Sequence, residues 1–338
     1  MKILLVQTSF LGDTILSTPV ISGIKRIYPA SELWVMTTPL SAHLVKRDPL
    51  LSGVIEYDKR NQESGLAGLL RMAQKLRAMQ FDRVYSLHRS YRTSLLLWLA
   101  RIPRRIGCQD ARFAGLYHET RARDFSAHDV LRNLSILTGE RDLASFDQEM
   151  RLFAPRADAI NPKLRQQIAE AAPYAVIAPG SVWKTKMWFS EGFRSVAAYL
   201  RQQGYQVVLT GAAADETACR TVSRDLDLIN LAGKSDISET MYVVRHADLV
   251  VCNDSMTLHM ASAFKIPNVA VFCATSPKFG YGPWKNRAVV VEKQDLACKP
   301  CRPHGSMLCP EGTDACMNEL PPEQVIAAIP KVLAPECP

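Results

Sequence analysis

Residues 247–259 read Ala-Asp-Leu-Val-Val-Cys-Asn-Asp-Ser-Met-Thr-Leu-His, and this stretch decides the fold. Its apolar run is typical of a buried strand, and residues 257–264 have the spacing of a helix. In open α/β sheets ligands bind at the carboxyl ends of strands, and a helix N-terminus offers N–H groups to an anion. A polar pocket suited to a sugar phosphate is therefore predicted from four side chains: Asp254, Ser255, Thr257 and His259.

The same alternation of apolar runs and amphipathic stretches continues on both sides of this motif. Strands are predicted at 2–8, 32–37, 54–57 and 83–87, and again at 175–178, 206–210, 228–231, 249–252 and 268–272. Helices are predicted at 64–79, 93–100 and 128–137, and again at 193–203, 215–225, 238–245 and 257–264. Strands that alternate with helices indicate a parallel, doubly wound sheet in each half. Neither half carries Gly-x-Gly-x-x-Gly, which argues against a dinucleotide dehydrogenase.

The length of the chain, 338 residues with 47% apolar content, suffices for two domains with full cores. Between about 154 and 173 the pattern lapses, and three prolines bracket a short polar helix there. The sequence therefore predicts an α/β protein with two Rossmann-like domains facing each other across a cleft. The expected bounds are 1–155 for the first domain, 156–173 for a linker, 174–320 for the second domain and 321–338 for a terminal segment.

The charge balance is basic, with 41 Lys and Arg against 33 Asp and Glu, a formal net charge of +8. Such a surplus suits nucleic acid, anionic lipid or a phosphorylated substrate, and it is equally compatible with a solvated surface. The basic runs are not interleaved with stacking aromatics, which argues against nucleic acid. No signal peptide or apolar run of membrane-spanning length is visible, so a cytoplasmic location with mostly reduced thiols is expected. Contact with a membrane surface remains open.

The first predicted strand leads into Ser9-Phe10-Leu11-Gly12-Asp13-Thr14. Gly12 permits a ligand to approach the backbone. Asp13 lies at the strand-to-helix junction, where it is either a helix cap or a general base that takes a hydroxyl proton.

The second half begins with a strand that ends in Pro-Gly and is followed by two lysines, Lys184 and Lys186. Lysine is a compact charge suited to phosphate, although a solvated loop is the alternative. After the next strand, Asp215 or Glu216 could accept sugar hydroxyls or could simply be acids in the first turn of a helix. The loop 275–284, rich in hydroxyls, glycine and aromatics, is a candidate lid over a nucleotide.

Two basic clusters in the first half follow predicted strands, and both should lie at the same sheet edge as Asp13. They contribute four candidates: Lys59, Arg60, Arg89 and Arg92. Arginine can bind carboxylate or phosphate through two parallel hydrogen bonds. The later runs at 101–105 and 121–123 suit a solvated face better.

The cysteines Cys298, Cys301, Cys309 and Cys316 have the spacing C-x2-C-x7-C-x6-C within a Cys-rich loop at 295–318. The first pair has zinc-ligand spacing and the second does not. Reduced thiols in a long loop are favoured over structural zinc or an iron–sulfur cluster.

These motifs, taken in order, resemble glycosyltransferase family 9, the ADP-heptose:lipopolysaccharide heptosyltransferases, and most of all the heptosyltransferase II type. The resemblance covers nearly the whole chain and is carried by 11–14, 17–19, 57–60, 87–90, 103–107, 179–181, 184–188 and 253–255, and by the cysteine loop.

The resemblance implies a GT-B fold, with the acceptor on the first domain and the nucleotide sugar on the second. It implies Asp13 as the base, and Lys186 as a ligand of the donor phosphates with Lys184 beside it. Asp254, Ser255 and His259 would line the donor site, together with Ser181 and Thr257, and the last helix would pack back on the first domain. The family has glycine where this chain has Met256, which leaves the donor open.

The implied reaction is an inverting, metal-independent transfer of heptose from ADP-L-glycero-D-manno-heptose to the Kdo/heptose–lipid A inner core of lipopolysaccharide. No cofactor is expected, and the enzyme would be peripheral on the cytoplasmic face of the inner membrane. Two alternatives remain: a UDP-hexose or UDP-N-acetylhexosamine transferase acting on the same core, and a noncatalytic protein that binds a nucleotide sugar.

Overall fold

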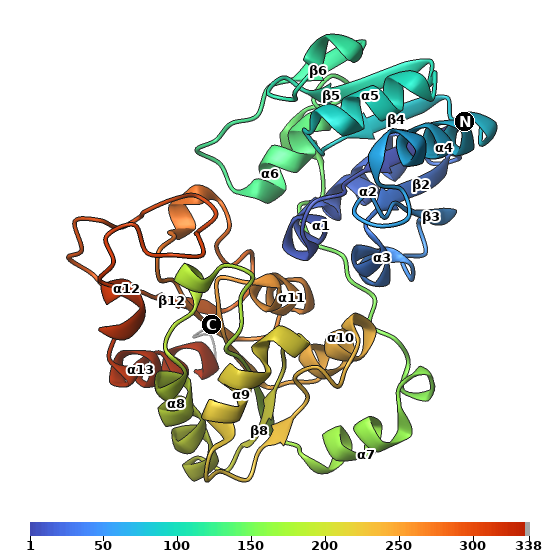
Figure 1. The fold of residues 1–338 in the computed structure, drawn as a ribbon. Coiled ribbons are helices and arrows are strands. Elements are labelled where there is room, and N and C mark those ends of the chain that lie inside the picture. Colours follow the sequence, from blue (N-terminus) through green and yellow to red (C-terminus); the bar gives the residue numbers. More distant parts are fainter. Residues whose placement is uncertain (335–338) are drawn as a thin grey trace. The chain divides into compact units, whose positions relative to one another are not determined.

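The computed structural model describes residues 1–334 and divides the chain into two compact units, Met1–Phe153 and Ala154–Pro338 (Figure 1). Each unit has one parallel sheet of six strands covered by helices. This confirms the α/β class with two Rossmann-like halves. Among the helices of residues 1–334, none has the length and apolar character needed to cross a membrane.

The sheet of the N-terminal unit has the order β3-β2-β1-β4-β5-β6. Its strands are β1 Lys2–Val6, β2 Glu32–Thr37, β3 Gly53–Glu56, β4 Arg83–Ser86, β5 Arg104–Cys108 and β6 Glu119–Arg121. The order reverses between β1 and β4, because the chain first builds outward from β1 and then returns to its other side. In this fold class such a reversal is where ligands bind.

The helices of the N-terminal unit are α1 Leu11–Ser17, α2 Pro19–Ile27, α3 Pro39–Val45, α4 Gly65–Ala78, α5 Tyr91–Leu99 and α6 Asp129–Leu134. Short 3-10 turns are η1 Ala114–Leu116, η2 Ser135–Leu137 and η3 Leu143–Ser145. The helices α4 and α5 contribute Leu69, Leu76, Leu96 and Leu97 to one core layer, where they meet Leu4 and Val84 of the sheet.

The C-terminal sheet has the order β12-β11-β10-β7-β8-β9, which repeats the plan of the first sheet. Its strands are β7 Tyr174–Ala178, β8 Gln206–Leu209, β9 Ile229–Asn230, β10 Leu249–Asn253, β11 Asn268–Val271 and β12 Ala288–Val291. Here the order reverses between β7 and β10, and all five residues of each of these strands are buried. Continuous apolar runs of this kind are expected for strands covered on both faces.

The helices of the C-terminal unit are α7 Pro162–Glu170, α8 Ser190–Gln202, α9 Glu216–Ser223, α10 Ile237–Arg245, α11 Met256–Phe264, α12 Ala315–Asn318 and α13 Pro322–Leu333. The 3-10 turns are η4 Ala157–Ala159, η5 Lys184–Lys186, η6 Ala213–Asp215 and η7 Pro277–Phe279.

The helix α13 is part of the C-terminal unit. Its packing against the first domain, which the resemblance implied, stays a prediction. In the structure its apolar side, with Val325, Ala328, Ile329 and Val332, belongs to the core of the C-terminal unit. The helix contacts α8, β11 and β12. These buried residues follow the three- and four-residue spacing of a helix with one apolar face, and that face is used within its own unit.

Several elements differ from the prediction for identifiable reasons. Arg104 and Arg105, predicted as part of a solvated run, form the more exposed end of β5, whose last three residues are buried. The segment predicted as one helix over 128–137 is α6 followed by η2. The strands β6 and β12 and the helices α2 and α3 were not predicted, and only the start of α1 was indicated, by the strand-to-helix junction at Asp13. The interruption at Thr18-Pro19, where α2 begins, breaks the helical pattern into two short pieces.

Candidate functional site

The centre of the candidate donor site in the C-terminal unit is an ion pair between Lys186 and Asp254. Lys186 follows β7 and Asp254 follows β10, the two strands between which the sheet order reverses. Their Nζ and Oδ2 atoms lie 2.7 Å apart, and the side chains are only 12% and 4% exposed. Thr275, after β11, donates its hydroxyl to the same Oδ2 at 2.7 Å. A positive charge is thereby fixed at the sheet edge, where phosphate would bind.

Asn253, the last residue of β10, holds the lysine-bearing loop in place. It is fully buried. Its Oδ1 accepts from the backbone N–H of Trp188 at 3.0 Å, and its Nδ2 donates to the carbonyl of Pro179 at 2.7 Å. The segment between Pro179 and Trp188 is therefore tied at both ends to β10. The sequence motif contained Asn253, but nothing in its spacing assigned this role to its side chain.

The start of α11 supplies the hydroxyl and histidine side chains of the site. Ser255 is the N-cap residue in extended backbone, and its Oγ is buried with no hydrogen-bond partner within residues 1–334. Thr257 and His259 are both buried on the same helix. A buried hydroxyl without a partner costs free energy, so Ser255 suits a ligand that supplies one.

Met256 is the first residue of α11 and is partly exposed. It is not among the residues whose backbone has a positive φ. The glycine expected here is therefore not required by the backbone conformation.

The two acids after β8 lie in different surroundings. The Oδ2 atom of Asp215 accepts from the N–H of Ala212 at 2.8 Å. A Cβ built on Gly180 would fall 2.2 Å from the Asp215 carboxyl carbon, so a larger residue cannot replace this glycine without displacing Asp215. Burial raises the pKa of Asp215. Glu216 is exposed and pairs with Arg220 one helical turn away at 3.0 Å, so Asp215 is the acid next to the loop after β7.

Two further residues of the predicted donor set lie on the loop after β7. Ser181 is partly exposed and Lys184 is exposed, at the start of the turn η5. Thr210, at the end of the neighbouring strand β8, has a buried hydroxyl without a partner among the described residues. Residues 275–284, predicted as a lid, contribute Thr275 through its bond to Asp254.

The cysteine-rich loop forms hydrogen bonds with the lysine loop, the segment that carries Lys184 and Lys186. The N–H of Thr185 donates to the carbonyl of Ser306 at 3.1 Å, and the N–H of Ser306 donates back to the Thr185 hydroxyl at 2.8 Å. Ala274 and Cys301 continue the chain of backbone bonds, at 3.1 and 2.9 Å. The loop that carries both lysines is thus packed between the end of β11 and the cysteine loop.

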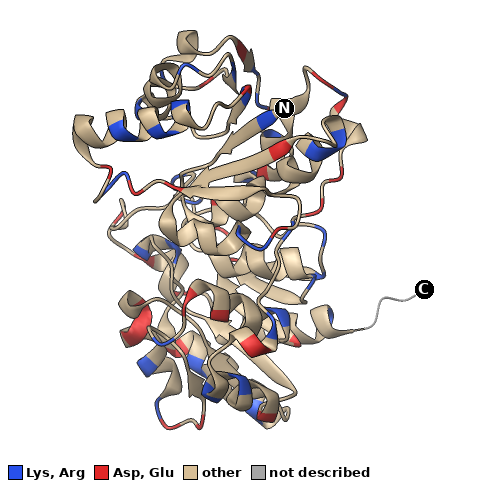
Figure 2. Cartoon of the chain, turned by 90° about the vertical axis from the view of Figure 1, so that its right-hand side faces the viewer, with Lys and Arg blue, Asp and Glu red and all other residues tan. Residues whose placement is uncertain are grey.

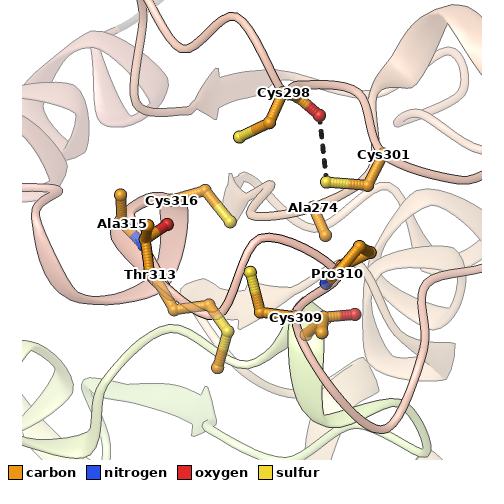
Figure 3. Close-up of a pocket in the computed structure, with 10 residues that line it drawn as sticks. Ala274, Cys298, Cys301, Cys309, Pro310, Thr313, Ala315 and Cys316 are labelled. Carbon is orange, nitrogen blue, oxygen red and sulfur yellow. Dashed lines mark hydrogen bonds between the residues drawn. The ribbon is translucent and has the colours of Figure 1, made fainter.

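All four cysteines of the loop line one small cavity together with Thr185 and Ala274 (Figure 3). They are free thiols, and the Cys301 thiol donates to the carbonyl of Cys298. Backbone N–H groups around Cys309 lower its pKa, whereas burial raises the pKa of Cys316 to about 11. Within residues 1–334 no group of three or more His, Cys, Asp or Glu is arranged to hold a metal ion.

In the N-terminal unit the corresponding sheet edge carries Asp13 and the first basic cluster. Asp13 is the third residue of α1, and its Oδ2 accepts from the N–H of Phe10 at 3.2 Å. Lys59 crosses from the loop after β3 and donates to the carbonyl of Thr8 at 2.7 Å. The hydroxyl of Thr8 is buried without a partner among the described residues. Burial lowers the pKa of Lys59.

The three arginines of the predicted acceptor set have different roles in the unit. Arg92 donates to the Tyr57 hydroxyl at 2.7 Å and to the carbonyl of Glu63, which secures the loop after β3. Arg89 pairs with Asp110 and stays partly exposed. Arg60 is exposed. Arg60 and Arg89 are therefore the more accessible pair for an acidic acceptor.

His88 is a site candidate that the sequence prediction did not include. It follows β4, and the strand order of this sheet reverses between β4 and its neighbour β1. Its Nδ1 lies 2.6 Å from the Thr93 hydroxyl. Burial, with Lys59 and Arg89 nearby, lowers the pKa of His88 to about 3. A neutral imidazole beside Lys59 is therefore part of this edge.

Comparison with known proteins relates this chain to one family. Residues 69–310 match the model of glycosyltransferase family 9 (heptosyltransferase). The chain is 28% identical to lipopolysaccharide heptosyltransferase 3 of Escherichia coli K12, over 97% of this chain and 96% of that protein. It is 24% identical to lipooligosaccharide heptosyltransferase 2 of Campylobacter jejuni serotype O:6, over 99% and 100%.

The fold is similar to two solved structures. One is the ADP-heptose lipopolysaccharide heptosyltransferase II of E. coli, with a TM-score of 0.79 and 23% identity over 98% of each chain. The other is a glycosyltransferase of family 9 from Veillonella parvula, with a TM-score of 0.85 and 24% identity over 98% of this chain and 97% of that one.

Proposed function

Because this chain belongs to glycosyltransferase family 9, the heptosyltransferases, we propose that it transfers heptose from ADP-L-glycero-D-manno-heptose to the inner core of lipopolysaccharide. The observation that carries the proposal is the buried Lys186–Asp254 pair beside the unpartnered Ser255 hydroxyl, at the reversal point of the C-terminal sheet. This arrangement suits an anion, and the Ser255 hydroxyl is placed to hydrogen-bond a sugar. The C-terminal unit is then the donor domain and the N-terminal unit the acceptor domain.

The donor choice is supported by a protein of the same fold. An E. coli heptosyltransferase, with a TM-score of 0.73 and 18% identity, is described with ADP-2-deoxy-2-fluoro heptose. In the present chain Lys186 and Lys184 would bind the diphosphate. Asp215, Ser255, Thr257 and His259 would meet the sugar and ribose hydroxyls.

In the proposed reaction Asp13 accepts the proton of an acceptor hydroxyl as that oxygen bonds to the anomeric carbon of the donor. The bond from the anomeric carbon to the diphosphate breaks on the opposite side, so the configuration inverts, and the electron pair leaves with ADP. The transition state has oxocarbenium character. The lysines and the N-terminus of α11 stabilise the charge that develops on ADP, a task for which this site needs no metal ion.

The acceptor is proposed to be the Kdo/heptose–lipid A core, whose acidic groups would meet Arg60 and Arg89 first. A lipid-borne acceptor would place the enzyme peripherally on the cytoplasmic face of the inner membrane. The net charge of +8 favours such a surface.

A panel of donors tests the proposal. The chain would be mixed with a heptose-deficient core acceptor and ADP-heptose, UDP-glucose or UDP-N-acetylglucosamine, and the product would be identified by mass spectrometry and by NMR of the new glycosidic bond. We expect transfer from ADP-heptose alone, with inversion. Preferential transfer from a UDP sugar would replace the donor assignment. Binding of every donor without transfer or hydrolysis would identify a noncatalytic nucleotide-sugar-binding protein.

A further inference from the structure

The N-terminal unit has an exposed apolar surface on the outer side of α4 and α5. Five large side chains form it, each between 43% and 67% exposed: Leu66, Leu70, Tyr91, Trp98 and Phe113. Exposed large hydrophobics are scattered singly on most proteins, but a contiguous group marks an interaction site.

The five side chains come from elements that pack together. The helices α4 and α5 are in contact, and α5 contacts η1 next to Phe113. The rings of Tyr91 and Phe113 meet edge to face, with centroids 6.4 Å apart. Arg92, beside Tyr91, donates to the carbonyl of Glu63 just before α4, which ties the first turns of the two helices together. Leu66 and Leu70, like Tyr91 and Trp98, recur at helical spacing on one face.

The helix α5 is apolar on both faces. Its inner face buries Leu96 and Leu97 against the sheet, and its outer face presents Tyr91 and Trp98. A helix with apolar side chains on two faces is normally covered on both, so the outer face of α5 suits an apolar partner.

Basic residues outnumber acidic residues around this apolar group. The helix α4 contains Arg71, Lys75 and Arg77 and no acidic residue. Arg101 lies three residues after Trp98, Arg112 lies directly before Phe113, and both are exposed. Of the nearby acids, Asp110 pairs with Arg89, whereas Asp82 and Glu63 accept from the backbone N–H groups of Lys2 and Asp58 and keep their charge. Figure 2 colours the basic and acidic positions along the chain.

We propose that this α4–α5 surface docks the protein on an anionic lipid bilayer, with the five apolar side chains in the interfacial layer and the cations among the phosphates. Aromatic side chains favour the boundary between headgroups and acyl chains, and basic residues beside them add attraction to anionic lipid. Phe113 and Tyr91 lie near Arg89, since the N–H of Arg112 donates to the carbonyl of Arg89. Docking would therefore bring the proposed acceptor residues to the headgroup layer. This inference rests on the proposed function for its purpose, but the surface is tested independently of it.

The first experiment measures sedimentation of the full chain with vesicles of equal parts phosphatidylglycerol and phosphatidylcholine. We expect the wild type to bind, and the triple variant Tyr91→Ser/Trp98→Ser/Phe113→Ser to bind at least about tenfold more weakly. The matched control is Leu40→Ser, which removes a 62% exposed side chain from α3, a helix that contacts α1, β2 and β3. It should bind as the wild type does. Absence of vesicle binding by the wild type, or equal binding by the triple variant, would overturn the proposal.

A charge variant separates the two components of the surface. Arg71→Glu/Lys75→Glu/Arg77→Glu should abolish the preference for these vesicles over pure phosphatidylcholine, and added salt should have the same effect on the wild type. If the wild type instead dimerises without lipid and the triple serine variant is monomeric by sedimentation velocity, the surface belongs to a second copy and the bilayer is excluded.

Turnover of a deacylated core acceptor in solution distinguishes this inference from the proposed function. We expect the triple serine variant to transfer heptose to that acceptor as fast as the wild type does, and to lose rate only on acceptor embedded in vesicles. If the wild type fails to use ADP-heptose with either acceptor, the proposed function fails, and vesicle binding still decides the docking surface. An equal rate loss on both acceptors would count against docking.

Discussion

Lys186 and Asp254 are the residues on which the donor site depends, and their burial makes them sensitive in two ways. Removal of the lysine leaves a carboxylate that is 4% exposed, and among residues 1–334 the Thr275 hydroxyl is its one remaining hydrogen-bond donor. Breaking a buried pair from one side destabilises by about 3–5 kcal/mol. We therefore expect Lys186→Ala to lower the free energy of unfolding by about this amount and to weaken ADP binding at least tenfold.

Urea unfolding and isothermal titration calorimetry with ADP measure the two effects. Lys184→Ala is the matched control: its side chain is exposed, so stability should change by less than about 0.5 kcal/mol while ADP affinity still falls. An unchanged ADP affinity in Lys186→Ala would remove the lysine from the phosphate site.

Asp13 combines a structural contact with the proposed chemical role, and one substitution separates them. An asparagine keeps an oxygen that can accept from the N–H of Phe10, as Asp13 Oδ2 does, but it cannot accept a proton from the acceptor. We expect Asp13→Asn to slow transfer by about 10²–10⁴-fold with ADP affinity and stability near those of the wild type. Initial rates and ADP calorimetry on the same sample measure this, and a variant that turns over normally would show that another group is the base.

His88 makes a prediction about pH. The pKa of His88 in the folded chain is about 3, against an ordinary value of 6.5. Between pH 6.5 and pH 3 the unfolded chain therefore binds a proton at this residue and the folded chain does not. The stability associated with the neutral ring is therefore present above pH 6.5 and is lost as the pH falls toward 3. Relative to His88→Gln, the free energy of unfolding of the wild type should fall more steeply in that window, by up to about 1.4 kcal/mol per pH unit.

Urea titrations of both proteins on either side of pH 6.5 give the two slopes. The comparison uses slopes because His88→Gln also changes the contact with Thr93, which shifts stability equally at every pH. Parallel curves would mean that His88 has the same pKa in the folded and unfolded chain.

At the scale of the element, the donor site is an arrangement of strand ends held together by Asn253. Its side chain joins the loop after β7 to β10 through two buried hydrogen bonds. Truncation leaves an N–H and a carbonyl unsatisfied, each at about 1–3 kcal/mol. We expect Asn253→Ala to lower the free energy of unfolding by about 2–4 kcal/mol and to weaken ADP binding, because the lysine loop loses its anchor.

Chemical denaturation and ADP titration of Asn253→Ala measure both effects. The control Asn161→Ala removes only the N-cap of α7, on an exposed residue, and should cost about 1 kcal/mol without altering ADP affinity. A normal ADP affinity in Asn253→Ala would show that the loop keeps its shape without this side chain.

The extent to which sequence predicts such elements depends on how local the signal is. The apolar run of β10 and the hydroxyls at the start of α11 are adjacent in the sequence, so a polar strand end could be predicted there. β5 was hidden because Arg104 and Arg105 occupy its exposed end. Other features depend on which strands become neighbours, and no local sequence pattern indicates that. They are the Lys186–Asp254 contact, the burial of Asn253 and the lowered pKa of His88.

At the scale of the whole molecule, the two units have separate cores with different residues. We expect scanning calorimetry of the full chain to show two overlapping transitions. ADP at a hundred times its Kd should stabilise only the C-terminal unit, by about 2.7 kcal/mol. Leu97→Ala, a fully buried residue of the N-terminal core, should lower only the other transition. One transition that responds as a unit to both changes would contradict this.

The bracing of Thr185 by Ser306 and Ala274 has a consequence for the thermodynamics of recognition. A loop that is already ordered by hydrogen bonds lost its conformational entropy during folding. Binding of an anion therefore costs little additional conformational entropy. Preorganisation of this kind favours small fragments as well as whole ligands. The lysine loop should therefore bind inorganic pyrophosphate with measurable affinity. Inhibitors that lack the adenosine group could then bind at this loop.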